Sequence, residues 1–222
     1  MPFSEFKKKA FRAMAKKPEN TFETKKRIFS ASAKLFAMKG YEASSMREIA
    51  RTADVNLALI NYHFKDKSLL LTAVLNHGRK LIIEMFDRHA NKELEQMLRA
   101  LMKDFTDETG AAYYVNIFMR LYLDTNAKLD IKRSITRKGA PKIDVLQKAV
   151  ARAMNKPEID CECVLIAHFL FNNLILSSRI KFGLGNDEIK NSYLNDCFPE
   201  KVDDPYAEQL VLLARSLTGS VG

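Results

Sequence analysis

The chain has 222 residues, and its 36 lysines and arginines exceed its 27 aspartates and glutamates, which gives a formal net charge of +9 at pH 7. This length suffices for one large or two modest domains with a buried core, so a disulfide scaffold is not required. Only 8 glycines and 6 prolines occur, a composition that favours helix over sheet, and no run approaches about 20 apolar residues, so we expect an all-α protein without a membrane span.

Residues 1–20 form a basic amphipathic stretch that contains six lysines and arginines. Residues 1–90 contain 18 lysines and arginines against 9 aspartates and glutamates, whereas residues 91–222 contain 18 of each kind. A one-sided basic surplus is typical of a segment that neutralises the phosphates of nucleic acid or of an anionic membrane surface, but a solvated basic face gives the same pattern. Residues 1–20 are therefore interpreted as a basic arm that follows DNA or as a free terminus, with a membrane-surface helix as a third alternative.

A first helix is predicted over about 21–39, because apolar residues recur at helical spacing from Ile28 to Phe36. Gly40 can adopt the left-handed conformation that often follows a helix, and Tyr41 can fold back onto the last turn. Both features predict that the first helix stops at residue 39.

Two short helices follow the first one. Ser45 and Glu48 form a capping box, in which the Ser45 hydroxyl accepts a backbone N–H while Glu48 reaches back to the Ser45 amide, and the helix that they start ends near Thr52. Asn56 can cap another short helix that continues to about His63. Two short helices separated by about four residues are the skeleton of a helix-turn-helix.

A long helix is predicted from Lys67 to about His89, with Asp66 as its cap. It is too long to belong to a DNA-reading unit alone. Further helices are predicted at about 92–107, 110–127, 141–154, 160–182, 186–195 and 205–218.

The motif residues between about 24 and 71 resemble the DNA-binding domain of the TetR family in unbroken register. The resemblance is carried by Ile28-Phe29, Leu35-Phe36, Gly40-Tyr41, Ser45-Met46-Arg47-Glu48-Ile49-Ala50, Val55-Asn56, Tyr62-His63-Phe64 and Lys67. It departs from the commonest pattern at Asp54, where a glycine is usual, and at Asn61, where an aromatic residue is frequent. Asp tolerates the left-handed conformation better than most residues. The residues Asn-Tyr-His-Phe resemble the motif of a subset of the family, several members of which sense fatty-acyl or related lipophilic compounds.

The resemblance implies an N-terminal three-helix helix-turn-helix domain at 21–66, followed by a helical effector-binding and dimerisation domain at 67–222. It also implies a cytoplasmic homodimer that binds double-stranded operator DNA as a ligand-responsive transcriptional regulator. The expected activity is repression of transcription by binding to a palindromic operator, from which a small, lipophilic effector releases the protein. An effector-independent DNA-binding or nucleoid-associated dimer is the alternative, and it would lack a cavity in the C-terminal part.

The third helix, which follows Asn56, is the natural recognition element, because its first turn and outward face could enter a major groove about 12 Å wide. Asn61 is the candidate base reader, since an amide can pair bidentately with adenine. Some residues have a competing structural role: Ser45 and Asn56 as caps, and His63 in a structural hydrogen bond. The predicted DNA-binding residues are Ser45, Arg47, Asn56, Leu57, Ala58, Asn61, Tyr62, His63 and Lys67, with phosphate contacts expected from Ser45, Arg47, Tyr62 and Lys67.

Two further sets of residues are predicted in the C-terminal part, although each member also suits an ordinary core. Aromatic and thioether side chains around a few polar groups suit an apolar ligand; they are Met97, Leu101, Phe105, Tyr113, Phe118, Met119, Tyr122, Phe169 and Asn173. The broad apolar faces of 160–182 and 205–218 suit a four-helix dimer interface; the candidates are Phe171, Ile175, Ser178, Leu210, Leu213, Ala214 and Leu217.

Enzymatic activity, a cofactor and a bound metal are not expected. The four histidines have no evident nucleophile or metal partner at a suitable spacing, and no phosphate-cradling glycine loop occurs. The three cysteines, Cys161, Cys163 and Cys197, read as reduced thiols of a cytoplasmic protein, because their number is odd and they lack partnering histidines.

Overall fold

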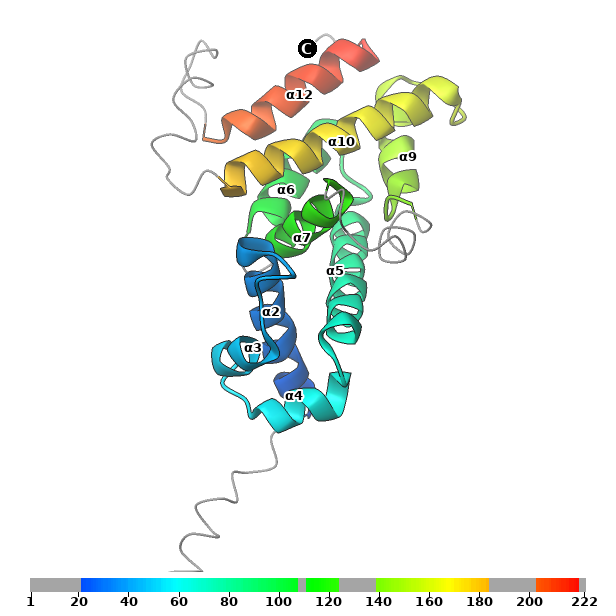
Figure 1. Ribbon diagram of the computed structural model, residues 1–222. Helices are drawn as coiled ribbons and strands as arrows, with labels where there is room; N and C mark the ends of the chain where they lie inside the picture. Colours follow the sequence, from blue (N-terminus) through cyan, green and yellow to red (C-terminus); the bar gives the residue numbers. More distant parts are fainter. Residues whose placement is uncertain (1–20, 108–110, 124–138, 184–202, 220–222) are drawn as a thin grey trace, which may run out of the picture. The chain divides into compact units, whose positions relative to one another are not determined.

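The computed structural model describes residues 21–107, 111–123, 139–183 and 203–219. Every regular element within these ranges is an α-helix (Figure 1), which confirms the predicted fold class. The chain divides into two compact units, one ending at Leu71 and the other beginning at Thr72. The basic arm at 1–20, the predicted helix at 186–195 and Cys197 lie outside the described residues.

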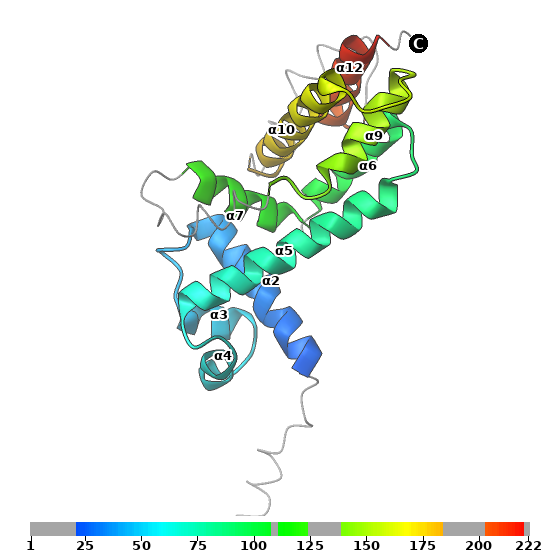
Figure 2. The same ribbon diagram turned by 90° about the vertical axis from the view of Figure 1, so that its right-hand side faces the viewer.

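The N-terminal unit contains α2 (Thr21–Lys39), α3 (Met46–Thr52), α4 (Leu57–Phe64) and the first turn of α5 (Lys67–His89). Helix α3 packs against both α2 and α4 (Figures 1 and 2). The fully buried side chains of Ile28, Ile49, Ile60 and Leu70 each come from a different helix and form the centre of this unit. The predicted helix-turn-helix skeleton is therefore present, with each helix within a residue or two of its expected bounds.

Local signals end the first helix where the sequence indicates. Gly40 has a φ of 90°, in the left-handed region that costs glycine little. The Tyr41 ring folds back against Phe36, with ring centroids 5.7 Å apart. The backbone can therefore turn towards α3 directly after Lys39.

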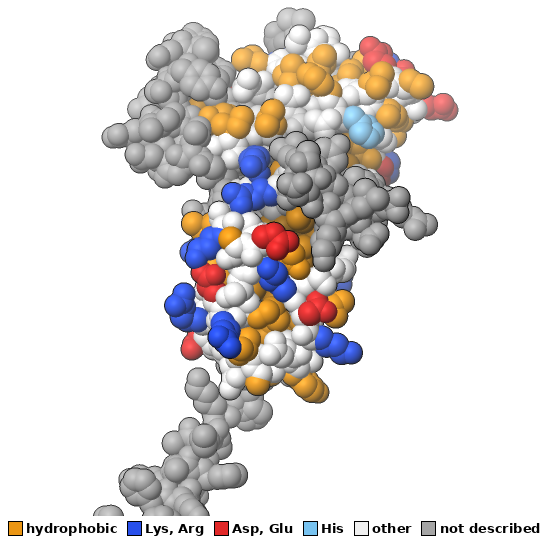
Figure 3. All heavy atoms as spheres, viewed as in Figure 1, with side chains coloured by type: hydrophobic (Ala, Val, Ile, Leu, Met, Phe, Trp, Pro, Cys, Tyr) orange, Lys and Arg blue, Asp and Glu red, His pale blue; other side chains and the backbone are white. Residues whose placement is uncertain are grey.

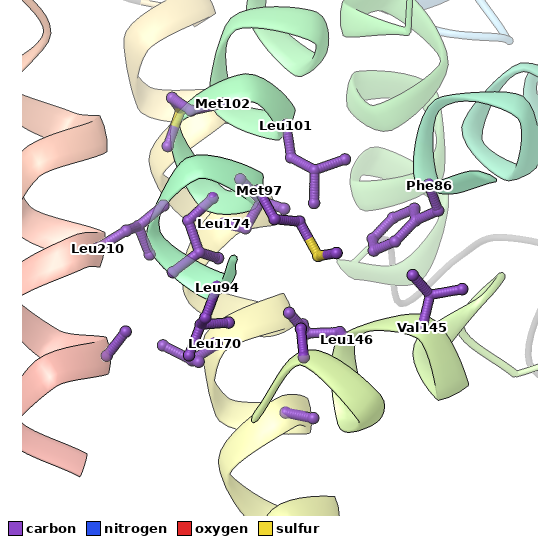
Figure 4. Close-up of a cluster of buried hydrophobic side chains, with 14 of the residues drawn as sticks. Phe86, Leu94, Met97, Leu101, Met102, Val145, Leu146, Leu170, Leu174 and Leu210 are labelled. Carbon is purple, nitrogen blue, oxygen red and sulfur yellow. The ribbon is translucent and has the colours of Figure 1, made fainter. Parts of the chain in front are cut away.

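The C-terminal unit contains the remainder of α5 and five further described helices. These are α6 (Leu94–Thr106), α7 (Ala112–Leu123), α9 (Ile143–Ala153), α10 (Cys161–Gly183) and α12 (Pro205–Thr218). Helix α10 is central, because it packs against α6, α7, α9 and α12. Figure 4 shows the resulting core, in which Met97 and Leu101 of α6 lie among Phe86 of α5, Leu146 of α9 and Leu174 of α10.

Ion pairs join α12 to α6 at the margin of this core. Arg99 donates through Nε and Nη2 to the Glu208 carboxylate at 2.7 and 2.8 Å, and Arg215 donates in the same two-pronged way to Glu95 at 2.6 and 2.8 Å. Arg99 also lies 3.5 Å from Glu95, so the four residues form one continuous network. The arginine hydrogen bonds lower the pKa values of both carboxylates.

Helix α10 contains a segment, Cys161–Ile180, that is long and apolar enough to cross a bilayer by length and composition, a property that the sequence interpretation did not assign to it. A core helix of a soluble protein passes the same test. Cys163, Ala167, Leu170 and Leu174 lie on one face of α10 and are fully buried. One face of this segment thus packs as in a core helix, while only 39% of the segment is buried.

Candidate nucleic-acid interface

Two side-chain caps set the starts of α3 and α4. The Ser45 hydroxyl accepts the backbone N–H of Glu48 at 3.2 Å, and the Glu48 carboxylate accepts the backbone N–H of Ser45 in return. Asn56 Oδ1 accepts the backbone N–H of Ala58 at 2.8 Å. Both predicted caps are confirmed, and they satisfy donors that the first turn of a helix leaves open.

The turn between α3 and α4 depends on a left-handed residue. Asp54 has a φ of 51°, so an aspartate occupies the conformation for which the family pattern usually has glycine. Arg27 of α2 donates to the Asp54 carbonyl oxygen at 3.3 Å, and the Val55 N–H donates to the Ala50 carbonyl at 3.0 Å. These bonds hold the turn, and therefore the start of α4, in one position.

Helix α4 has one buried face and one exposed face. Ile60 is 0% exposed and Phe64 is also buried, as predicted, while Asn61 is exposed and Tyr62 is 81% exposed. The Tyr62 ring is therefore free to contact a partner of the domain. The structure brings the predicted recognition residues together on this outward face, with Ala58 exposed and Leu57 half-buried beside them.

His63 lies at the edge of that face and is half-buried. Its ring centroid is 5.2 Å from that of Tyr62, in an edge-on arrangement, and 6.1 Å from that of Phe64. The imidazole therefore packs between an exposed and a buried aromatic ring.

Helix α3 presents Ser45 and Arg47 at the surface. Its neighbouring carboxylate, Glu48, is paired with Lys39 from the end of α2. The Lys39 hydrogen bond lowers the pKa of Glu48, which keeps this carboxylate ionised and paired with α2. Figure 3 shows several lysine and arginine side chains over the N-terminal unit in this view.

Lys67, at the start of α5, does not extend into solvent. Its Nζ lies 2.9 Å from the carbonyl oxygen of Tyr41, 3.1 Å from that of Ser44 and 3.4 Å from that of Glu42. The ammonium also lies 4.3 Å from the centroid of the Tyr41 ring. The predicted phosphate-binding lysine thus faces backbone carbonyls of the loop between α2 and α3.

The residues predicted to contact an effector do not share one environment. Met97, Leu101, Phe105 and Tyr113 are buried, and Met119 packs against the core. Phe118 and Phe169 are exposed, and Asn173 donates to the Phe169 carbonyl at 2.9 Å. The side chain of Tyr122 lies outside the described part of the chain.

The residues predicted for the dimer interface pack largely within their own chain. Ile175, Ser178, Leu210 and Ala214 are buried, and the remaining three, Phe171, Leu213 and Leu217, pack against the core. The exposed apolar side chains of the same helices are different residues. Sequence reasoning assigned Phe169 to the effector site and missed the other four: Leu165, Leu176, Ile180 and Leu212. Figure 3 shows hydrophobic side chains gathered over α10 and α12 in this view.

No cluster of three or more histidine, cysteine, aspartate or glutamate side chains that could hold a metal ion occurs among the residues that the structure describes. Cys161 is exposed, Cys163 is buried, and both are free thiols.

Residues 28–74 match the family model of bacterial regulatory proteins of the tetR family. The chain is 34% identical over 84 residues to the HTH-type transcriptional regulator YvkB of Bacillus subtilis, covering 36% of this chain and 44% of that protein. It is 42% identical over 67 residues to an HTH-type transcriptional repressor of Mycobacterium tuberculosis, covering 30% of this chain and 36% of that protein. The chain thus spans less than half the length of these relatives.

Two solved structures share the fold over most of the chain at low sequence identity. A TetR-like transcriptional regulator from Rhodococcus sp. RHA1 has a TM-score of 0.61 and 16% identity, covering 89% of this chain and 97% of that one. The regulator FadR from Bacillus subtilis, solved in complex with stearoyl-CoA, has a TM-score of 0.55 and 14% identity, covering 88% and 98%. The matched motif at residues 28–74 and these relatives point to the TetR/AcrR family of helix-turn-helix transcriptional regulators, and the solved structures show that the chain shares their fold.

Proposed function

We propose that the protein is a homodimeric regulator that binds double-stranded operator DNA through α4 and responds to a small effector in its C-terminal part. The observation that carries the proposal is the two-faced character of α4, because Ile60 and Phe64 are buried while Asn61 and Tyr62 face solvent. A helix anchored on one side by apolar residues can present the other side rigidly to a major groove. A DNA partner also implies a cytoplasmic location.

In this proposal Asn61 reads a base, while Tyr62, Arg47 and Ser45 contact phosphates. An amide can make two hydrogen bonds to adenine, whereas phosphate contacts fix register without specifying sequence. Ser45 and Asn56 already use a side-chain oxygen as a cap, so their primary role is to aim the helices. Leu57, Ala58 and His63 complete the proposed DNA-binding surface, where they would lie close to the DNA.

The test is selection of bound fragments from a random duplex library, followed by measurement of base preference for the wild type and for Asn61→Ala. We expect the variant to lose about 1–3 kcal/mol of discrimination at one base position in each half-site. Tyr62→Phe is the matched control, because it removes one hydroxyl from the same exposed face and should weaken all sequences alike. An unchanged preference profile in Asn61→Ala would remove this residue from base reading, and absence of any DNA binding by the wild type would refute the function.

We propose that a second copy of the chain buries the exposed apolar side chains of α10 and α12 in a dimer interface. Leu165 is 70% exposed, Leu176 is 50% exposed and Leu212 is 52% exposed. Burial of such side chains contributes about 25 cal/mol for each Å² removed from water, and two helices from each subunit form a compact four-helix contact. A two-fold dimer would place its recognition helices about 34–36 Å apart and would require a palindromic operator.

Sedimentation velocity tests this assignment. Leu176→Glu should shift the protein towards monomer, because the substitution leaves a charge at the centre of an apolar contact. Met38→Glu is the matched control, since Met38 is an equally large exposed side chain, but on α2 of the N-terminal unit. Equal dimer content in both variants would place the interface elsewhere.

The proposed effector is lipophilic and binds among the aromatic and thioether side chains of α6 and α7. Met97, Leu101 and Phe105 are fully buried in one hydrophobic cluster, so an apolar ligand there would have to displace side chains of that cluster. Displacement of these side chains would couple effector binding to movement of the helices that carry them. Helix α5 contains the boundary between the two units, so its movement could reach the N-terminal unit. We therefore propose that an effector weakens DNA binding by displacing α5.

Stearoyl-CoA, the ligand found in the FadR structure, is the probe with which to test effector binding. Titration calorimetry should give a lower affinity for DNA-bound than for free protein, by the same factor by which the ligand weakens DNA binding. Coenzyme A without the acyl chain is the control for the lipophilic part. Equal affinities for free and DNA-bound protein would favour the alternative, a DNA-binding dimer without an effector response.

A further inference from the structure

The ammonium group of Lys67 is committed to backbone carbonyls. A lysine side chain has three N–H donors and no acceptor. Its Nζ lies within hydrogen-bond distance of three carbonyl oxygens, those of Tyr41, Ser44 and Glu42, at 2.9, 3.1 and 3.4 Å. Every donor therefore has an acceptor inside the N-terminal unit.

The loop that supplies these carbonyls joins α2 to α3 and ends at the cap of α3. Ser44 is buried, its hydroxyl donates to the Gly40 carbonyl at 2.7 Å, and its N–H donates to the Tyr41 carbonyl at 3.3 Å. Lys67 adds charge-assisted bonds to the same loop, and such bonds are about twice as strong as neutral ones. The Tyr41 ring, which packs on Phe36, lies beneath the ammonium and completes its surroundings.

We infer that Lys67 is a positioning residue, which ties the loop at 41–44, and through it the Ser45 cap of α3, to the start of α5. Helix α3 packs against α4, so this tie also holds the exposed face of α4 in place. To bind a phosphate, Lys67 would first have to release a carbonyl. The effect on DNA affinity rests on the proposed DNA-binding function, whereas the tie itself does not.

Two measurements on the full chain separate positioning from phosphate contact. The first is amide hydrogen exchange in wild type and Lys67→Met, which removes the charge while keeping a side chain of similar length. The second is fluorescence anisotropy with a mixed-sequence duplex of about 30 base pairs, from about 50 to about 200 mM KCl. Arg47→Met provides the calibration, because Arg47 is an exposed cation on α3 that we expect to contact phosphate.

We expect Lys67→Met to exchange the amides of residues 42–49 at least about tenfold faster than wild type, with the interior of α2 unchanged. Its DNA affinity should fall by a similar factor at every salt concentration, so the slope of log affinity against log salt stays at the wild-type value. In Arg47→Met that slope should decrease by about 0.9 per subunit, as for one lost phosphate contact.

Unchanged exchange in Lys67→Met would overturn the inference, and so would a decrease in slope as large as that of Arg47→Met. Should Lys67→Met fail to fold, Lys67→Gln, which keeps two N–H donors without the charge, is judged by the same two criteria. If wild type shows no salt-dependent DNA binding, the proposed function fails, while hydrogen exchange still decides whether the tie exists.

Discussion

Gly78 of α5 lies where α5 and α7 approach each other closely. A Cβ added at this position would lie 2.4 Å from Cδ1, 2.5 Å from Cγ and 2.6 Å from Cβ of Tyr114. Because the third of these atoms is at the root of the side chain, rotation of the ring cannot relieve the contact. Gly78→Ala therefore requires α5 and α7 to move apart at this point.

The expected cost follows from two opposing effects. Overpacking of a tight contact costs about 1–3 kcal/mol, whereas alanine in place of glycine in a helix interior gains about 1 kcal/mol. All three contacts fall below 3.0 Å, so we take the upper part of the overpacking range. We expect a net loss of about 1–2 kcal/mol in the free energy of unfolding, measured by urea denaturation with circular dichroism at fixed protein concentration.

A double-mutant cycle with Tyr114→Ala provides the control. This substitution removes Cγ and Cδ1, so Gly78→Ala should cost less in its presence, with a coupling of about 1 kcal/mol or more. If Gly78→Ala instead stabilised the protein by about 1 kcal/mol, the value expected from helix propensity alone, the close approach would not be a rigid feature and the reasoning would be refuted.

Three further outcomes are expected. Ser45→Ala should lower the free energy of unfolding by about 0.5–2 kcal/mol in urea denaturation through loss of the cap, while Ser45→Asp should retain the cap but weaken DNA binding by adding negative charge. Burial raises the pKa of Tyr114 to about 12. The stability that this residue contributes is therefore complete below about pH 10 and is lost as pH rises towards 12. The free energy of unfolding of Tyr114→Phe should depend less on pH in that window, and a pH dependence identical to that of the wild type would contradict the raised pKa. The pair between Glu95 and Arg215 is partly exposed, so a double-mutant cycle should give only a weak coupling. A coupling as strong as that of a buried ion pair would contradict this expectation.

Much of the helical architecture could be predicted from local patterns. The caps at Ser45 and Asn56, the left-handed Gly40 and the tolerance of Asp54 for positive φ all act within a few residues of chain. Such interactions are readable from sequence because their partners are sequence neighbours. The long α5 was predicted from Lys67 to His89, the bounds that the structure has.

The assignment of helix faces was less successful where a helix is apolar on nearly all sides. Helix α10 carries apolar residues on both its core face and its exposed face, so periodicity does not separate Leu174, which is buried, from Leu176, which is half exposed. Its buried side is decided by where α6, α7, α9 and α12 lie. The outward residues were therefore missed, although the apolar surplus of α10 was a signal that both faces need cover.

Local patterns sufficed to locate the described helices and the helix-turn-helix motif, because caps, turns and hydrophobic spacing depend on neighbouring residues. The contacts of Lys67 and the exposed side of α10 could be seen only in the folded chain. Lys67 meets carbonyls 23 to 26 residues away in the chain, and a contact over that separation depends on how whole helices pack.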